Sequence, residues 1–436
     1  MNKVIIVTYY WPPSGGGGVQ RWLKFAKYLP QFGWEPIIVT PENPNFSLKD
    51  ESLMHDVSPE LRVIKLPIWE PHELFYKLKG VRSYEKVNQN DIIDKPDKKL
   101  SDKLGIWLRG NLFIPDPRVF WVKPTFQYLK KLMREEGIQT VITTGPPHSM
   151  HLIGRKLKQA LGVTWLADFR DPWTGWFMYR EFSISSLASR LHQQQEQKVL
   201  RAADRVTTVS DILANDLSNI AGREVETLTN GFDPDDFQDF TKHLSAQSEK
   251  FVIKHTGTID LVRDPRPLLH AITSLCNEHK DFAESVEINF IGHLSGVISS
   301  EINRSPIAEK ITLTPYLPHK QLKQEYASAS VLLLLLSTAP ETKCVLSGKT
   351  FEYLASSTPI LAIGPTDGEV ARVLKRTGAG VLVDPGNLEG IKKELLILFN
   401  RFKQREMNRE IQPDISSFSR VSLSEKLADM LNQTQK

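Results

Sequence analysis

The first 40 residues alternate between apolar runs and a glycine-rich turn, in an order that predicts a strand, a helix and a second strand. Residues 3–8 form a β-branched run, residues 9–18 are rich in Pro and Gly, and residues 19–32 carry apolar side chains at helical spacing. Residues 35–40 form a second apolar run. This order makes a βαβ unit, which predicts a parallel sheet covered by helices.

The same alternation continues in two runs and predicts an α/β protein of two doubly wound parallel sheets. The further predicted strands span residues 140–143, 164–168, 205–209, 250–255, 286–291, 311–314, 331–336, 360–363 and 380–383, and the further predicted helices span residues 126–136, 149–161, 193–203, 267–278, 320–328 and 351–356. We expect an N-terminal Rossmann-like domain over residues 1–240 with an excursion from the sheet at about 41–124, and a C-terminal one over residues 250–412. Residues 413–436 should form a helical segment that packs back on the N-terminal domain. Because such sheets bind ligands at the carboxyl ends of their strands, the site should lie in a cleft between the domains.

Composition narrows the class of protein and of partner. A chain of 436 residues exceeds what one hydrophobic core usually organises, and its net charge of +4 gives no reason to expect a nucleic acid partner. Cys276 and Cys344 are too few for a disulfide framework, which fits a reducing cytosol. The apolar runs at residues 4–7 and 331–336 are too short for a signal peptide or a membrane span, so we expect a cytoplasmic chain.

The glycine-rich turn that precedes the first helix is a candidate phosphate site. Backbone amides and the positive end of the helix favour an anion there, which makes Gly16 and Gly17 candidate binding residues. The dinucleotide fingerprint G-x-G-x-x-G/A fails, because its last position falls on Gln20 or Arg21. This mismatch argues against a dehydrogenase.

Residues 347–350, Ser-Gly-Lys-Thr, imitate a P-loop, but the first glycine that this motif requires falls on Lys343. The segment can still bind phosphate. Gly348 permits close approach of the backbone, Lys349 supplies a point charge, and Thr350 lies in the opening turn of a helix. The alternative is a solvated helix start.

Two further patterns are candidate metal or sugar sites. Asp233 and Asp235 match D-x-D, a pattern of paired hard oxygens, yet Asp before Pro is also simple turn chemistry, so we expect no metal. His148 and His151 share one face of a predicted helix start. A neutral His148 could hydrogen-bond a sugar hydroxyl, and a capping or core role is the alternative for both rings.

Residues 168–173 close another predicted strand with two carboxylates, a guanidinium and an indole. Asp168, Arg170, Asp171 and Trp173 are what a polyhydroxylated ligand needs at a strand end, so they are candidate acceptor-side residues. The alternative is an internal ion pair between Asp and Arg that supports the loop.

Several motifs in order resemble glycosyltransferase family 4, the retaining enzymes of GT-B fold, over nearly the whole chain. The motifs are Tyr10-Trp11-Pro12-Pro13 with its glycine loop, Asn230-Gly231-Phe232-Asp233, and Lys349 with Glu352-Tyr353-Leu354-Ala355 and Thr358-Pro359-Ile360-Leu361. The resemblance implies transfer of a sugar from a nucleotide diphosphate sugar to a hydroxyl acceptor, in surface polysaccharide or glycolipid synthesis. It implies retention of configuration, no metal and no other cofactor.

The resemblance also implies roles for residues of the C-terminal domain. Glu352 would accept hydrogen bonds from the ribose hydroxyls, and Gly257 would lie at the donor. Two positions depart from the family pattern, because Cys344 stands where the family has a glutamate, with Glu341 the nearest acid, and Thr258 stands where it has an arginine.

Arg263 and Arg266 are the nearest replacements for the missing arginine. We expect Arg263 and Lys349 to stabilise the charge that develops on the departing diphosphate, which is a catalytic role, and Arg266 to bind the donor. His148 joins the catalytic candidates. The family's route needs no protein nucleophile, since the acceptor attacks on the leaving-group face and the departing phosphate takes its proton.

A membrane and two other functions stay open. Basic residues alternate with apolar ones in one stretch, which suits an anionic bilayer or else a layer covering the domain; the residues are Lys98, Lys99, Lys103, Arg109 and Arg118, with Leu104, Ile106, Trp107, Leu108, Leu112, Phe113 and Trp121. The acceptor would then be a saccharide or a lipid-linked molecule. The enzyme would be a peripheral protein on the inner face of the membrane. A nucleotide-sugar epimerase of the same architecture and a catalytically silent binding protein are the alternatives.

Overall fold

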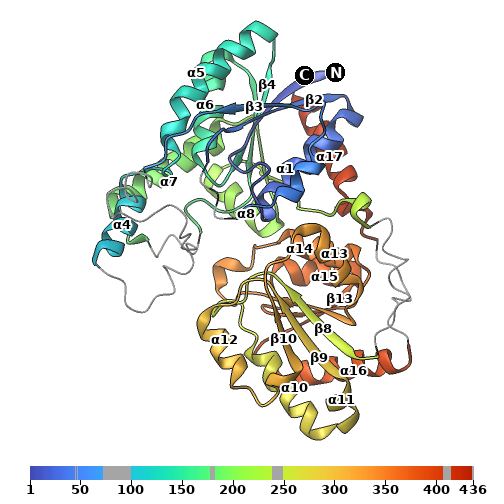
Figure 1. Cartoon of the computed structure of the whole chain (residues 1–436). Helices are drawn as coiled ribbons and strands as arrows, with labels where there is room; N and C mark the ends of the chain where they lie inside the picture. The colour runs from blue at the N-terminus through green and yellow to red at the C-terminus, as the bar shows by residue number, and fades with distance from the viewer. Residues whose placement is uncertain are drawn as a thin grey trace. The chain divides into compact units, whose positions relative to one another are not determined.

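The chain folds into two compact units, each around its own sheet (Figure 1). The structure is a computed structural model and describes residues 1–44, 46, 48–71, 100–176, 182–237, 249–405 and 414–434. The first unit holds Met1–Thr229 together with Leu423–Lys436, and the second holds Asn230–Ser422.

The first unit is built on a seven-stranded sheet of order β3-β2-β1-β4-β5-β6-β7, in which the described neighbours pair in parallel. Its strands are β1 (Asn2–Val7), β2 (Trp34–Pro41), β3 (Arg62–Leu66), β4 (Thr140–Gly145), β5 (Thr164–Phe169), β6 (Arg205–Thr208) and β7 (Glu226–Thr227). Its helices are α1 (Gly17–Tyr28), α4 (Leu100–Asn111), α5 (Val119–Glu136), α6 (Ser149–Leu161), α7 (Ser186–Ala202), α8 (Asp211–Ala221) and α17 (Arg420–Thr434), with 3₁₀ turns at Leu29–Phe32 and Glu51–Asp56.

The two ends of the chain share one core in this unit. Trp22 and Phe25 of α1 pack with Val4 of β1, and Leu427 and Leu431 of α17 belong to the same buried cluster. Figure 1 shows α17 in red near the blue α1. Burial of apolar area from both ends fixes the final helix to a sheet whose first strand lies more than 400 residues earlier in the chain.

The second unit is built on a six-stranded parallel sheet of order β10-β9-β8-β11-β12-β13. Its strands are β8 (Phe251–Thr256), β9 (Val286–Ile291), β10 (Ile311–Thr314), β11 (Val331–Leu335), β12 (Ile360–Ile363) and β13 (Gly380–Val383). Its helices are α10 (Arg266–Glu278), α11 (Lys280–Ser285), α12 (Gly296–Asn303), α13 (His319–Ala327), α14 (Gly348–Ala355), α15 (Glu369–Thr377) and α16 (Leu388–Lys403), with 3₁₀ turns at Pro234–Phe237, Ala308–Lys310, Pro340–Thr342 and Ser416–Phe418.

Both sheets reverse their strand order once, and this reversal decides where a ligand fits. The first sheet reverses between β1 and β4, and the second reverses between β8 and β11. Connections leave such a pair of strands in opposite directions, which opens a crevice at their carboxyl ends. The segments that follow β1, β4, β8 and β11 are therefore the places to look for a site.

The predicted architecture of two doubly wound parallel sheets is confirmed, and every predicted strand is present. Those at residues 286–291, 311–314, 360–363 and 380–383 have the predicted bounds. Among the described helices, none is long and apolar enough to cross a membrane.

The prediction that residues 41–124 leave the sheet is wrong at β3. This strand pairs with β2 in parallel, from Ile37 opposite Arg62 to Pro41 opposite Leu66. It lies at the sheet edge and is only half buried, so it needs few apolar residues and its pattern is hidden among polar neighbours.

Candidate functional site

The carboxyl end of β8 in the second unit brings a lysine against a glycine. Gly257 has φ of 121°, a conformation that side chains rarely tolerate, and its amide donates to the Ile291 carbonyl at 2.7 Å. A Cβ atom at Gly257 would lie 2.5 Å from Lys349 Nζ. Glycine is therefore required for Lys349, from the first turn of α14, to reach this strand end.

Lys349 is a cation without a counter-ion in the part of the chain that the structure describes. No hydrogen bond or ion pair joins it to another described residue. Burial and the nearby Arg263 guanidinium lower the pKa of its ammonium to about 7, and Glu352 opposes this shift. A half-buried, unpaired ammonium at the reversal of a parallel sheet is a site for an anion.

The start of α14 supports the same anion. Its N-cap residue, Ser347, makes no side-chain capping hydrogen bond, and the space beside Gly348 is open. Helix N-termini of this kind bind phosphate through backbone amides. Thr350 is different, because its side chain is fully buried beside Ser347, so the structure does not present it as the predicted donor-binding residue.

Glu352 lies one turn further along α14 and is held from two sides. His319 Nε2 lies 3.0 Å from one carboxylate oxygen, and Tyr326 Oη donates to the other at 2.8 Å. Burial alone would raise the pKa of Glu352, but the charge of His319 and the two hydrogen bonds outweigh it and lower the pKa. In His319, Glu352 outweighs burial and raises the pKa, so the two residues form an ion pair.

Arg263 and Arg266 take different places. Arg263 lies in the loop after β8, where its guanidinium pairs with Asp260 at 2.9 Å and it also influences Lys349. Arg266 opens α10 and is engaged by Asp264 at 2.7 Å and by Glu301 at 3.8 Å, with 43% of its side chain exposed. The structure thus brings Arg263, and not Arg266, to Lys349.

Cys344 stands where the family pattern has a glutamate, and it brings no carboxylate to this position. The side chain of Cys344 is buried, and its thiol donates to the Glu341 carbonyl at 3.4 Å. The other acidic pattern forms a turn, since the Asp235 amide donates to a carboxylate oxygen of Asp233, which is 4% exposed. No group of three or more His, Cys, Asp or Glu side chains within the described ranges could hold a metal ion.

In the first unit, Arg170 braces the crevice between β1 and β4. Its guanidinium donates to the Gly18 carbonyl at 3.0 Å and to the Pro146 carbonyl, so it joins the two loops that flank the reversal. Gly16 is the N-cap residue of α1, with φ of 88°, and Gly17 is the first residue of this helix. Arg170 was predicted to bind a ligand, but the structure shows its guanidinium engaged with the backbone of these two loops.

His148 and Trp173 stack in parallel, with ring centroids 5.0 Å apart. Burial, with the charges of His151 and Arg170, holds the pKa of His148 well below its ordinary value, so the ring is neutral. His148 Nδ1 is buried without a partner among the described residues, and Trp173 Nε1 donates to His192 at 3.1 Å. His151 is a core residue stacked on Phe169.

Asp168 is not an acceptor-side residue. Its carboxylate is fully buried and accepts five hydrogen bonds, two from Arg21 and one each from Trp22, Thr144 and Thr207. Those donors occupy its lone pairs, so none remains for a ligand. Asp168 does form an internal ion pair, but with Arg21 of α1 and not with the arginine of its own motif, Arg170, as the alternative expected.

Asp171, three residues on, is half buried, and burial raises the pKa of its carboxyl group while the charge of Arg170 opposes the rise. No hydrogen bond or ion pair joins it to another residue of the described ranges.

Three residues of the candidate site were not predicted from the sequence. His255, His319 and Tyr326 surround Lys349 and Glu352 but belong to a strand interior and a helix whose patterns look ordinary. Only the fold brings α13 and α14 together.

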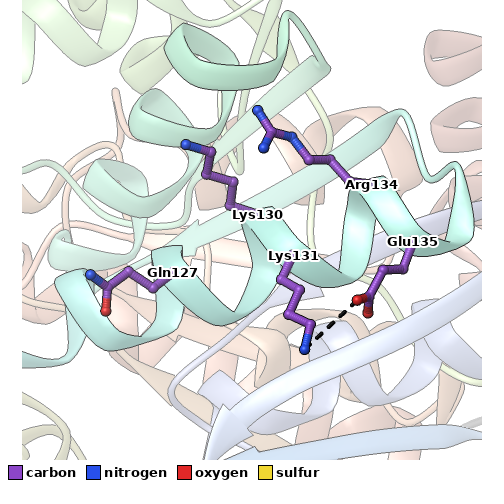
Figure 2. A pocket seen from close by; sticks show the side chains of 5 residues that line it. All are labelled: Gln127, Lys130, Lys131, Arg134 and Glu135. Atoms are coloured by element: carbon purple, nitrogen blue, oxygen red, sulfur yellow. Dashed lines mark ion pairs between the residues drawn. The ribbon is translucent and has the colours of Figure 1, made fainter.

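In the stretch between Lys98 and Trp121, some of the basic and aromatic side chains are buried and others are exposed. Trp121 is buried, and Arg118 pairs with the buried Glu70 at 2.8 Å, whereas Trp107 and Leu112 are 41% and 61% exposed. Lys98 and Lys99 lie outside the described residues, as do the side chains of Lys103, Leu104 and Ile106. Figure 2 shows the five side chains of α5 that line a pocket on this helix, which are Gln127, Lys130, Lys131, Arg134 and Glu135.

Comparison with solved structures defines the fold. Sucrose-phosphate synthase from Thermosynechococcus elongatus is similar over 99% of both chains, with a TM-score of 0.64 and 13% identity. Anabaena Alr3699/HepE in complex with UDP and glucose is similar over 99% of this chain and 100% of that chain, with a TM-score of 0.63 and 13% identity. The predicted GT-B fold of two Rossmann-like units is thereby confirmed.

The sequence also matches a known family. Residues 16–231 match the family described as "Glycosyl transferase 4-like domain", which supports the predicted resemblance over this part of the chain. D-inositol 3-phosphate glycosyltransferase 1 of Catenulispora acidiphila is 24% identical over 204 residues, which are 43% of this chain. The match spans 47% of that relative, or about half its length.

The buried Asp168 carboxylate should be a stability residue rather than a binding one. Asp168→Asn leaves the Arg21 cation without its counter-charge, and we expect the first unit to lose about 3–5 kcal/mol. All nine tryptophans lie between Trp11 and Trp176, so their fluorescence during urea unfolding reports on this unit. The neighbouring Asp171→Asn is the matched control, with a change within about 1 kcal/mol. Equal losses in both variants would contradict the assignment.

Proposed function

We propose that the protein transfers a sugar from a nucleotide diphosphate sugar to a hydroxyl acceptor with retention of anomeric configuration. The acceptor oxygen forms a bond to the sugar C1 while the bond from C1 to the donor phosphate oxygen breaks. The proton of the acceptor hydroxyl passes to the departing phosphate. The reaction is then balanced without a protein nucleophile.

The unpaired ammonium of Lys349 is the observation that carries the proposal. Together with Arg263 it supplies positive charge at the strand end where the diphosphate would lie. Negative charge grows on that diphosphate as the bond to the sugar breaks, so fixed cations stabilise the transition state more than the bound donor. We propose that these two side chains take the role that a metal ion has in other enzymes.

The nucleoside would lie toward Glu352. Its two oxygens already accept from His319 and Tyr326, and each retains a further lone pair for a ribose hydroxyl. The UDP complex of Alr3699/HepE, similar in fold, supports a nucleotide donor. Arg266 and Thr350, which the structure engages elsewhere, have no place in this donor site.

The acceptor would bind the first unit, in the crevice between β1 and β4. Three cations near this crevice are occupied, Arg21 by Asp168, Arg118 by Glu70 and Arg170 by backbone carbonyls. A neutral, hydroxyl-rich acceptor therefore suits it better than a phosphate. Asp171 would accept its hydroxyls, and Trp173 and His148 form the buried aromatic floor beneath the loop.

Surface polysaccharide or glycolipid synthesis would bring the enzyme to a membrane. The helix α5 carries the cations Lys123, Lys130, Lys131 and Arg134, the last three of them labelled in Figure 2. Of its two acids, Glu135 lies 3.7 Å from Lys131, and Glu136 pairs with Lys3 and Arg62. Tyr128 is exposed on the same helix. Clustered basic and aromatic side chains attract anionic lipid headgroups.

Donor binding should depend on Lys349. We expect one of UDP-, GDP- or ADP-sugars to raise the melting temperature of the protein, because a ligand of the native state stabilises it. Lys349→Met should weaken that binding by about tenfold to a hundredfold, as expected for loss of a charged hydrogen bond. Calorimetric titration measures the affinity.

Lys343→Met is the matched control, because Lys343 lies six residues away and pairs with Asp367 at the surface. It should bind the donor as the wild type does. Absence of a melting shift with every nucleotide sugar would contradict the proposal. Conversion of the bound donor to an epimer without any acceptor would favour the epimerase instead.

Membrane contact can be tested with vesicles. The protein should sediment with phosphatidylglycerol vesicles but not with phosphatidylcholine ones, and added salt should weaken the binding. Replacing Lys130, Lys131 and Arg134 by Glu should abolish it. The control carries the same three charge reversals at Lys280, Lys375 and Lys393, all exposed in the second unit. Equal loss in both variants would show a dependence on net charge and not on α5.

A further inference from the structure

His255 is a buried histidine that the donor chemistry above does not use. It is the fifth residue of β8 and is 0% exposed. Its Nδ1 lies 3.0 Å from the Leu333 carbonyl of β11, at the reversal of strand order. A carbonyl only accepts, so Nδ1 carries the proton of this ring.

The other ring nitrogen is therefore an acceptor. Burial, with the charges of Lys349 and Arg263, keeps the pKa of His255 well below its ordinary value, so the ring is neutral and Nε2 has a free lone pair. Nε2 is buried and has no partner within hydrogen-bond distance among the described residues, although the nearby Thr258 backbone also acts on the ring and raises its pKa. A buried acceptor without a donor lowers the stability of the fold, so its presence needs an explanation.

The reason lies at Gly257, two residues on. A Cβ atom there would lie 4.0 Å from His255 Nε2 and 2.5 Å from Lys349 Nζ, so both atoms border the space that a side chain at Gly257 would fill. One is an acceptor without a donor, and the other is a donor without an acceptor in the described part of the chain. Their chemistries are complementary.

We propose that His255 is a positioning residue for Lys349: its Nε2 accepts one N–H of the ammonium and leaves the other two N–H groups for the donor diphosphate. This inference rests on the proposed function of the site. A lysine has a long, flexible stem, and a fixed acceptor would hold its charge where the phosphate arrives.

The charged and titratable groups that face Lys349 are Arg263 from the loop after β8, Glu352 on its own helix, and His255. Burial and Arg263 disfavour the ammonium, and Glu352 favours it. The proposed hydrogen bond to Nε2 would favour it as well. Removing Nε2 should therefore lower the pKa of Lys349 from about 7, and donor binding should be lost at a lower pH as the pH rises.

Two variants separate this role from a structural one. His255→Asn retains a group that can donate to the Leu333 carbonyl but has nothing at the Nε2 position, whereas His255→Gln places an amide oxygen there. We expect His255→Asn to weaken nucleotide-sugar binding about tenfold and His255→Gln to restore it to within about twofold. In a Lys349→Met background, His255→Asn should have no further effect.

The pKa of Lys349 is measured without any nucleotide, from the pH dependence of its reaction with an amine-directed reagent followed by peptide mass spectrometry. His255→Asn should shift the curve to lower pH, and His255→Gln should not. Wild-type curves and affinities in His255→Asn would overturn the proposal, as would equal loss in both variants with lowered melting temperatures. If the curve shifts but no nucleotide sugar binds the wild type, the positioning stands and the proposed function fails.

Discussion

The close approach of the Lys349 ammonium to the backbone at Gly257 is the contact on which the proposed donor site depends. It requires a residue without a side chain at positive φ, and Gly292 at the end of the neighbouring strand keeps the backbone tight, since a Cβ there would lie 2.4 Å from the Gly257 carbonyl oxygen. The reversal between β8 and β11 leaves room above this point. A cation is thus held half buried with no counter-ion among the described residues, which is costly unless an anion completes the site.

In the first unit, by contrast, the arginine side chains near the reversal of strand order have partners within the fold. Asp168 and Arg21 neutralise each other in the interior, and Arg21 also donates to the carbonyls of Leu228 and Thr229 at the end of the unit. The guanidinium of Arg170 donates to backbone carbonyls in two loops. Charges that would otherwise attract phosphate serve the fold there, which leaves polar and aromatic groups for a neutral ligand. This difference between the units is the one that the proposed charged donor and uncharged acceptor require.

The strands could be predicted because buried parallel strands are near-continuous apolar runs, as in β11 with Val331–Leu335. The edge strand β3 could not, since exposure on one side permits polar residues. The helix α8 was missed although Ser210 caps its start and Gly222 ends it in a left-handed conformation, signals that a closer reading would find.

Of the candidate site, Gly257, Arg263, Lys349 and Glu352 were predicted and are brought together by the second unit. Asp168 and Thr350 were misplaced because sequence shows that a side chain ends a strand or opens a helix, but not that its partners lie inside. His255 and His319 could not be found, since their partners are 78 and 33 residues away along the chain.

The most direct test of the central claim is proton uptake when a nucleotide sugar binds, measured by calorimetry in buffers of different ionisation enthalpy. The pKa of Lys349 is about 7 in the free protein, and a bound diphosphate should raise it. Binding should then take up close to one proton at about pH 8, where the free lysine is mostly neutral, and almost none at about pH 6, where it is already charged. The uptake should vanish in Lys349→Met. Binding at about pH 8 without proton uptake in the wild type would show that Lys349 does not receive the diphosphate.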